Sequence, residues 1–244
     1  MSRAPAPHGR TGRPPLTSRA QILVAARGLI DRDGWEKLTI RRLAAELGIG
    51  ATTLYHHIRN KDDLLLLLLN HHIQQIERPP LPDDPRERIV TAALVMRDAL
   101  QAWPWAAEVL SADGFVGLLD EPAMWMVEAI VSGAGDHGCT PEQSVGLFRG
   151  VWYLTVGEVL VRAHSARRRD EGRPFAHRDD LDPAQVPYLA AIGVRWAPLA
   201  ARDVYPRTLG TLVDGLLAGA GGGGGGDDDG SADRRWPDSG AVVG

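Results

Sequence analysis

The stretch Leu38–Lys61 reads LTIRRLAAELGIGATTLYHHIRNK and predicts two short helices joined by a turn. Thr39 is a candidate N-cap for the first helix, because its hydroxyl can accept a hydrogen bond from a free backbone N–H. Gly48 is suited to end that helix, since a chain leaving a helix commonly adopts a positive φ. The residues expected on the buried stripe of this helix are Leu43, Ala44 and Leu47.

A second short helix is expected from Ala51 to Ile58, with Leu54 and Ile58 spaced for its inward face. Two helices joined by a short turn containing Gly have the geometry of a helix-turn-helix, whose second helix enters the DNA major groove. An ordinary pair of packed helices satisfies the same spacing, so both readings stay open on the pattern alone. The outward groups can hydrogen-bond phosphates or base edges: Thr52, Thr53, Tyr55, His56 and His57.

The segment from Gln21 to Leu69 resembles the DNA-binding domain of the TetR family of bacterial transcriptional regulators. It combines a first helix, ILVAARGLIDRDG, and Trp35 with the run TLYHHIRNKDDLL in register. The DNA contacts that the resemblance implies fall on Thr39, Arg41, Thr52, Thr53, Tyr55, His57 and Lys61. Among these we expect Arg41 to contact a base, because a guanidinium can pair bidentately with guanine. The other side chains in this set suit phosphates.

The charge is distributed as a DNA-binding end would require. The 244-residue chain has a formal net charge of −4, yet residues 1–61 hold 11 Lys and Arg against four Asp and Glu. That stretch is therefore +7 and the remainder −11. A basic end on an acidic body indicates that one end binds phosphate and the body does something else.

The sequence argues against several other classes of protein. The longest apolar run, Leu64–Leu69, is far shorter than the roughly 20 residues of a membrane span, and no secretory signal is recognisable. A single cysteine, Cys139, fits a reducing cytoplasm. We find no G-x-S-x-G, phosphate-binding Gly loop, HExxH or Cys–His pair, so we expect no enzyme and no catalytic residues. His71 and His72 have no acid or Cys at ligand spacing, so neither a metal nor a cofactor is expected.

Composition divides the chain into five parts. Residues 1–16 should be a disordered basic arm, in which Arg10 and Arg13 either reach the DNA or only add long-range attraction. The expected order is then a helix-turn-helix domain at 17–61, a connecting helix at 62–78, a helical body at 79–218 and a disordered Gly/Asp-rich tail at 219–244. The fold class is therefore all-α, because no alternating strand pattern occurs in the body.

The body contains a long helix that Thr140, Pro141 and Gln143 should start, running to about Arg168. Here the chain resembles the tetracycline-repressor branch of the family, which implies a homodimer formed by about 143–162 and 203–217. Packing of the two helices within one chain is the alternative. The chain departs from that branch's ligand contacts at Ile76, Glu77 and Ala92, so neither tetracycline nor its magnesium is expected.

An aromatic and sulfur-rich set in the body suits a bulky, mostly apolar small molecule, although side chains of this kind also build an ordinary core. Its members are Trp103, Trp105, Phe115, Met124, Trp125, Phe148 and Trp152. The sequence thus predicts a homodimeric repressor that binds double-stranded operator DNA and is released by an effector. An activator or ligand-independent regulator of the same fold is the first alternative, and a helical enzyme is the remote one.

Overall fold

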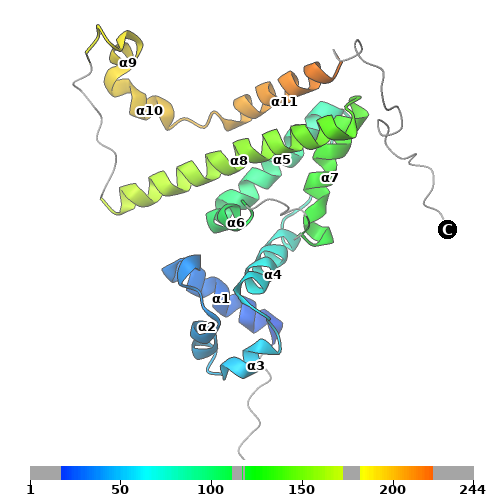
Figure 1. Ribbon diagram of the computed structural model, residues 1–244, viewed down its shortest axis with the longest axis vertical. Coiled ribbons are helices and arrows are strands. Elements are labelled where there is room, and N and C mark those ends of the chain that lie inside the picture. Colours follow the sequence, from blue (N-terminus) through cyan, green and yellow to red (C-terminus); the bar gives the residue numbers. More distant parts are fainter. Residues whose placement is uncertain (1–17, 112–116, 118, 173–181, 222–244) are drawn as a thin grey trace, which may run out of the picture. The chain divides into compact units, whose positions relative to one another are not determined.

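The computed structural model of the chain describes residues 18–111, 117, 119–172 and 182–221, and these residues form helices and connections without a strand (Figure 1). The all-α prediction is confirmed. The chain divides into two compact units after Leu69: unit 1 precedes this point and unit 2 follows it. The predicted basic arm, Phe115 and the predicted tail from residue 222 onward lie outside the described residues.

Unit 1 is a small helical domain built around the predicted stretch. Its first helix is capped by Ser18, whose side chain accepts the Gln21 N–H at 3.2 Å, while the Gln21 side chain accepts the Ser18 N–H at 2.9 Å. This capping box satisfies two backbone donors that a helix start leaves free. The elements are α1 (Arg19–Asp33), η1 (Trp35–Lys37), α2 (Ile40–Glu46), α3 (Ala51–Tyr55) and the first part of α4 (Lys61–Gln74).

The core of unit 1 forms where the apolar stripes of these short helices meet. Ala26 of α1, Leu43 of α2 and Leu54 of α3 are each fully buried. Four leucines of α4 join them: Leu64, Leu65, Leu68 and Leu69. Helices this short are marginal in water, so tertiary burial of these stripes is what stabilises them.

Helix α4 starts as predicted at Lys61 but ends at Gln74, two residues before the expected Ile76. The Asn60 side chain accepts the Asp63 N–H at 2.8 Å, and the Asp63 carboxylate accepts the Arg59 N–H at 2.9 Å. At the other end the Ile76 N–H bonds to the Ile73 carbonyl, three residues back, which closes the helix with a tighter turn.

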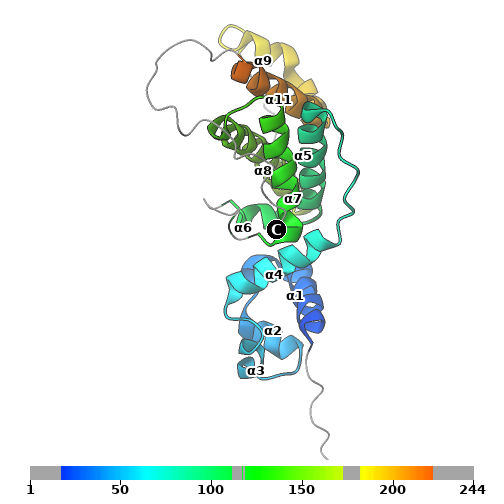
Figure 2. The same ribbon diagram turned by 90° about the vertical axis from the view of Figure 1, so that its right-hand side faces the viewer.

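Unit 2 is a larger helical bundle in which α5 and α7 lie side by side with α8 packed against them (Figure 2). Asp84 caps α5 by accepting the Glu87 N–H at 2.8 Å, and Pro85 occupies its first position. The elements are α5 (Pro85–Ala102), α6 (Pro104–Val109), α7 (Glu121–Asp136), α8 (Pro141–Asp170), α9 (Pro187–Ile192), η3 (Gly193–Arg195), α10 (Trp196–Ala200) and α11 (Tyr205–Gly221).

Helix α8 begins with the predicted capping box of Thr140 and Gln143 and runs for 30 residues. It ends at Asp170, close to the predicted end at about Arg168. Among the described residues, α8 alone is long and apolar enough by composition to cross a membrane. Seven of its residues are buried against the rest of unit 2, however, which is the environment of a core helix.

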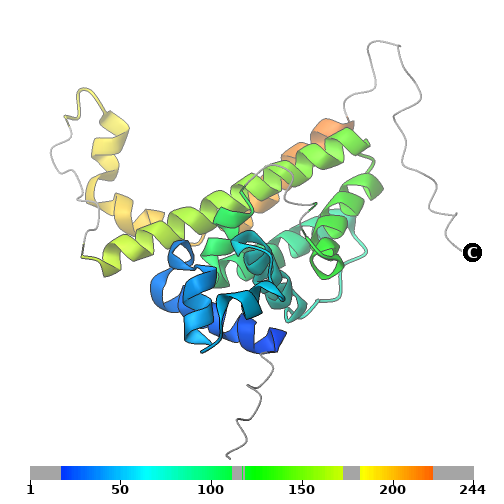
Figure 3. The same cartoon turned by 60° about the horizontal axis from the view of Figure 1, so that its bottom comes forward.

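The described part of the segment between α8 and α11 is irregular. Helix α9 stops at Ile192 after six residues. The reason is Gly193, whose φ of +51° takes the backbone out of the right-handed helical region. The last helix is longer than predicted, since α11 continues past Leu217 to Gly221 and includes the first residues of the expected tail. It lies alongside α8 (Figure 3).

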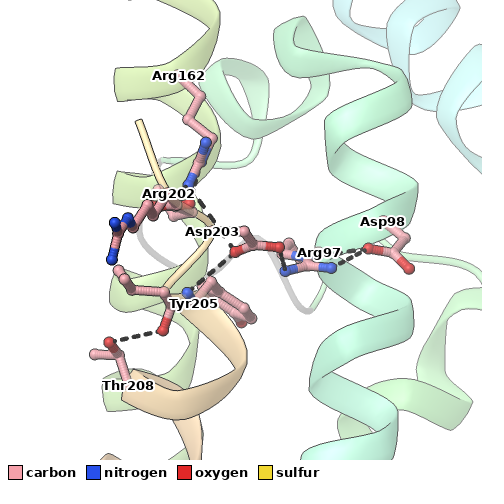
Figure 4. Close-up of polar contacts among 9 residues, drawn as sticks. Arg97, Asp98, Arg162, Arg202, Asp203, Tyr205 and Thr208 are labelled. Atoms are coloured by element: carbon pink, nitrogen blue, oxygen red, sulfur yellow. Dashed lines mark hydrogen bonds and ion pairs between the residues drawn. The ribbon is translucent and has the colours of Figure 1, made fainter. Parts of the chain in front are cut away.

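A cluster of polar contacts fixes the start of α11 to α5 (Figure 4). The Asp203 carboxylate accepts one hydrogen bond from Arg97 of α5 at 3.2 Å and another from the Tyr205 N–H at 3.1 Å. The Arg97 guanidinium also lies 4.9 Å from the centre of the Tyr205 ring. The Arg97 side chain is 12% exposed and the Asp203 side chain 55%, so water reaches the carboxylate and screens the ion pair.

One hydroxyl pair fixes α11 to α8. The Tyr205 hydroxyl lies 2.6 Å from Thr155 Oγ1, and Thr155 donates its own hydrogen to the Val151 carbonyl at 2.7 Å. Tyr205 must therefore be the donor within the pair. Burial raises the pKa of Tyr205, which keeps the phenol protonated and able to donate.

Replacing Thr155 by Val should destabilise the protein by about 1–3 kcal/mol, because the buried Tyr205 hydroxyl loses its acceptor while the shape is kept. Adding Tyr205→Phe removes the second partner and should recover most of that loss. Denaturant titration gives the free energy of unfolding of each variant. A double variant as unstable as the sum of the two single ones would show that the two hydroxyls do not interact.

Candidate DNA-binding surface

The turn between α2 and α3 has the predicted helix-turn-helix geometry. The Thr39 side chain accepts the Arg42 N–H at 3.2 Å, which confirms Thr39 as the N-cap of α2. Gly48 has a φ of +66°, as expected for a residue that ends a helix. After Gly50 the chain enters α3, which Leu54 anchors with no exposed surface.

The predicted polar face of α3 is exposed. Thr52 and Thr53 lie on its surface, and Tyr55 is 53% exposed. The helix ends at Tyr55, three residues earlier than predicted, because the His56 and His57 N–H groups bond to carbonyls three residues back. His57 is exposed in the turn that follows, so this turn, together with the helix, presents the predicted contact groups.

Of the two arginines of α2, Arg41 is the one that remains available to bind a ligand. It is exposed and has no hydrogen bond or ion pair within the described part of the chain. Its neighbour Arg42 instead forms an ion pair with Asp33 at the end of α1. Because the two arginines differ in this way, Arg41 can bind a ligand without breaking a contact that holds unit 1 together.

The acids of unit 1 are largely neutralised away from α3. Asp31 pairs with Arg27 at 2.6 Å, and Glu46 accepts a hydrogen bond from Arg32 at 3.2 Å. These pairs are solvent-exposed, so each contributes little to stability. Their effect on function is electrostatic, since they leave the positive charge of this segment dominated by cations that lack a nearby acid.

Lys61 has a local role that the sequence did not reveal. Its Nζ donates to the Glu36 carbonyl at 3.1 Å and lies 4.8 Å from the centre of the Trp35 ring. It therefore joins the first residue of α4 to η1. The ammonium carries three hydrogens, so a contact to a phosphate remains compatible with this bond.

The candidate effector residues lie in unit 2, where most of them are buried. Trp103, Trp105, Phe148 and Trp152 are each at most 8% exposed, while Met124 and Trp125 are half-buried. The ring centres of Trp103 and Trp105 are 5.4 Å apart. Phe115 falls within the part of the chain that the structure does not describe.

His72, which the sequence brought up only as a possible metal ligand, joins this aromatic group. Its ring stacks on Trp103 with a centroid distance of 4.0 Å and an angle of 11° between the planes. A signal was available, because His72 follows the buried Leu68 by four residues and so continues the buried stripe of α4. No group of three or more His, Cys, Asp or Glu side chains among the described residues could hold a metal ion.

Comparison with known proteins agrees with this geometry. Residues 22–68 match the family model described as bacterial regulatory proteins, tetR family. A Saccharopolyspora erythraea protein named HTH-type transcriptional regulator is 35% identical over 105 residues, which are 42% of this chain and 44% of that protein. The match thus spans less than half the length of this curated relative.

Two solved structures are similar over most of the chain. Streptomyces coelicolor ActR in complex with actinorhodin has a TM-score of 0.69 and 25% identity, covering 86% of this chain and 99% of ActR. BioQ with its double-stranded DNA operator has a TM-score of 0.57 and 25% identity, covering 82% of this chain and 98% of BioQ. The exposed polar face on a two-helix turn defines a helix-turn-helix protein. Residues 22–68 thus match the DNA-binding part of the TetR family, and the chain is similar in fold to two solved structures over most of its length.

Proposed function

We propose that this protein is a transcriptional repressor of the TetR family that binds operator DNA as a homodimer and leaves it when a small molecule binds unit 2. The observation that carries the proposal is the exposed surface of α3 and the following turn, together with an exposed Arg41 on α2 that has no hydrogen bond or ion pair among the described residues. Hydroxyl, imidazole and guanidinium groups are those that contact phosphates and base edges. We propose as contacts Thr39, Arg41, Thr52, Thr53, Tyr55, His57 and Lys61. The BioQ structure, which contains operator DNA, supports this.

The homodimer is proposed from the outer face of α8. Val145, Tyr153 and Val161 are 52%, 56% and 65% exposed. Each step of eight residues turns by about 80° round an α-helix, so these side chains are spread over the exposed half of α8 and do not form one line. Gly157 lies on the same exposed half, and an added Cβ there would meet no atom within 4 Å. An apolar face with small residues is suited to close approach by another helix, and a second copy of the chain offers the same face.

Part of the same helix pair packs within one chain. An added Cβ at Gly150 of α8 would lie 3.3 Å from Leu216 of α11, and Leu209 and Val213 of α11 are buried. The alternative, in which α8 and α11 pack against each other within one chain, thus applies to one side of these two helices. It leaves the outer face of α8 free for the proposed contact, which involves about 143–162 and 203–217.

Replacing Val161 by Ser should raise the dissociation constant of the dimer by roughly tenfold to a hundredfold, because two copies lose buried apolar surface at a two-fold interface. Sedimentation equilibrium of the full chain measures this constant. Val24→Ser changes a valine of α1 that is 73% exposed and serves as the control. Equal constants for both variants would remove α8 from the interface.

The effector is proposed to be a bulky, mostly apolar molecule that binds among the aromatic residues of unit 2. The ActR structure contains actinorhodin, which shows that a similar fold accepts a small molecule. Such a ligand can shift the protein away from DNA only through its different affinity for two conformers. The named relatives are regulators, which supports the expectation that the chain is not an enzyme. Action on genomic DNA places the protein in the cytoplasm.

The test of regulation is a footprint on DNA upstream of its own gene combined with transcription in vitro. We expect protection of two half-sites about one helical turn apart and lower transcription on binding. Protection with rising transcription would identify an activator. The absence of any protected site would contradict DNA-binding regulation itself.

A further inference from the structure

Two indole N–H groups of unit 2 are buried without an acceptor. They are Nε1 of Trp105 on α6 and Nε1 of Trp125 on α7, and neither has a hydrogen-bond partner within the described part of the chain. Trp105 as a whole is only 8% exposed. Buried donors in native proteins are nearly always paired, and an unpaired one lowers stability. Two such donors indicate an acceptor that the described part of the chain does not supply.

The surroundings of these donors are flat and aromatic. Trp105 adjoins Trp103, on which His72 stacks, so three rings are in contact. At the second donor, the Arg78 guanidinium lies 5.7 Å from the centre of the Trp125 ring. A flat ring fits the first environment, and the positive charge beside the second disfavours a cation.

We infer that the effector is a flat aromatic molecule with oxygen acceptors, such as ketone or quinone carbonyls, to which Trp105 and Trp125 donate their indole N–H groups. The inference rests on the proposed function and narrows its class of effector. A hydrocarbon of the same size would leave both donors unpaired. A site built to hydrogen-bond a ligand oxygen discriminates strongly against the analogue that lacks it.

A matched pair of probes tests the inference. Fluorene and 9-fluorenone share one ring frame, and only the second has a carbonyl that can accept a hydrogen bond from an indole N–H. Equilibrium dialysis of the full chain gives both dissociation constants. We expect 9-fluorenone to bind at least about tenfold more tightly than fluorene.

Two conservative variants show whether the indoles cause this preference. Trp105→Phe and Trp125→Phe keep an aromatic ring but remove the N–H, and each should reduce the preference for 9-fluorenone by about threefold or more. Fluorene binding should stay within about twofold, because the apolar contacts remain. Trp196→Phe alters a half-exposed indole on α10 and should change neither constant.

Several results would overturn the inference. They are equal binding of the two probes, no binding of 9-fluorenone, and a preference that survives in the Trp105→Phe, Trp125→Phe double variant. If water alone satisfied the two indole donors, the two probes would bind equally. The comparison of probes on the unaltered chain stands even where a variant fails to fold. Operator binding by the ligand-free protein tests the proposed function separately, so intact operator binding without a carbonyl preference refutes only the inference.

Discussion

The variant Arg41→Ala is expected to lose specific operator binding while remaining a folded dimer. Removing a bidentate base contact costs about 1–3 kcal/mol, and a homodimer loses two of them, so specific affinity should fall by roughly 30-fold to 20,000-fold. Stability should be unaffected, because Arg41 makes no hydrogen bond or ion pair with the rest of the described chain. Fluorescence anisotropy with an operator duplex and with a scrambled duplex measures the loss.

Arg169→Ala provides the matched control, since it removes the same charge from an exposed position near the end of α8. It should leave specific affinity within about twofold, apart from a small long-range effect of charge. If Arg41→Ala weakened the operator and the scrambled duplex equally, Arg41 would be a phosphate contact. If it kept full affinity for both, the assignment of Arg41 to the DNA would be wrong.

The second large effect is expected at Gly133 of α7, where α7 approaches α5 most closely. An added Cβ would lie 2.7 Å from Ile89 Cγ1 and 2.9 Å from the Pro85 carbonyl oxygen. The Pro85 oxygen belongs to the backbone, so the helices would have to separate. Gly133→Ala should therefore destabilise the protein by about 2–3 kcal/mol despite the better helix propensity of Ala.

Thermal unfolding followed by circular dichroism should show a midpoint lower by roughly 5–10 °C for Gly133→Ala. The control is Gly28→Ala in α1, where an added Cβ meets no atom within 4 Å, and which should be neutral or stabilising by up to about 1 kcal/mol. If the two variants unfolded at the same midpoint, the close approach of α5 and α7 would be incorrect.

The helices and the exposed polar face of unit 1 were predictable because their signals are local. The cap at Thr39, the positive φ at Gly48 and the buried Leu54 all follow from residues within one or two turns. The early end of α3 was missed, since the apolar spacing of Leu54 and Ile58 continues through a turn of tighter geometry. Spacing alone does not distinguish such a turn from a further helical turn.

The contacts that the sequence did not reveal join residues far apart in the chain. Lys61 bonds to Glu36, 25 residues earlier, and Arg97 bonds to Asp203, 106 residues later. Which cation meets which acid depends on how the helices pack, so local patterns do not contain this information. His72 is an intermediate case. Its place on the buried stripe of α4 could be predicted from the sequence, but its stacking on Trp103 could not.

The most direct test of DNA binding through the basic amino end is the salt dependence of affinity for the protein's own promoter DNA. Raising monovalent salt from about 50 to 200 mM should weaken binding by about a thousandfold or more, as expected when six to ten phosphates are contacted by a dimer. Sedimentation in the same buffers should show two chains per duplex. An affinity that does not change with salt, or a single chain bound per duplex, would contradict the account.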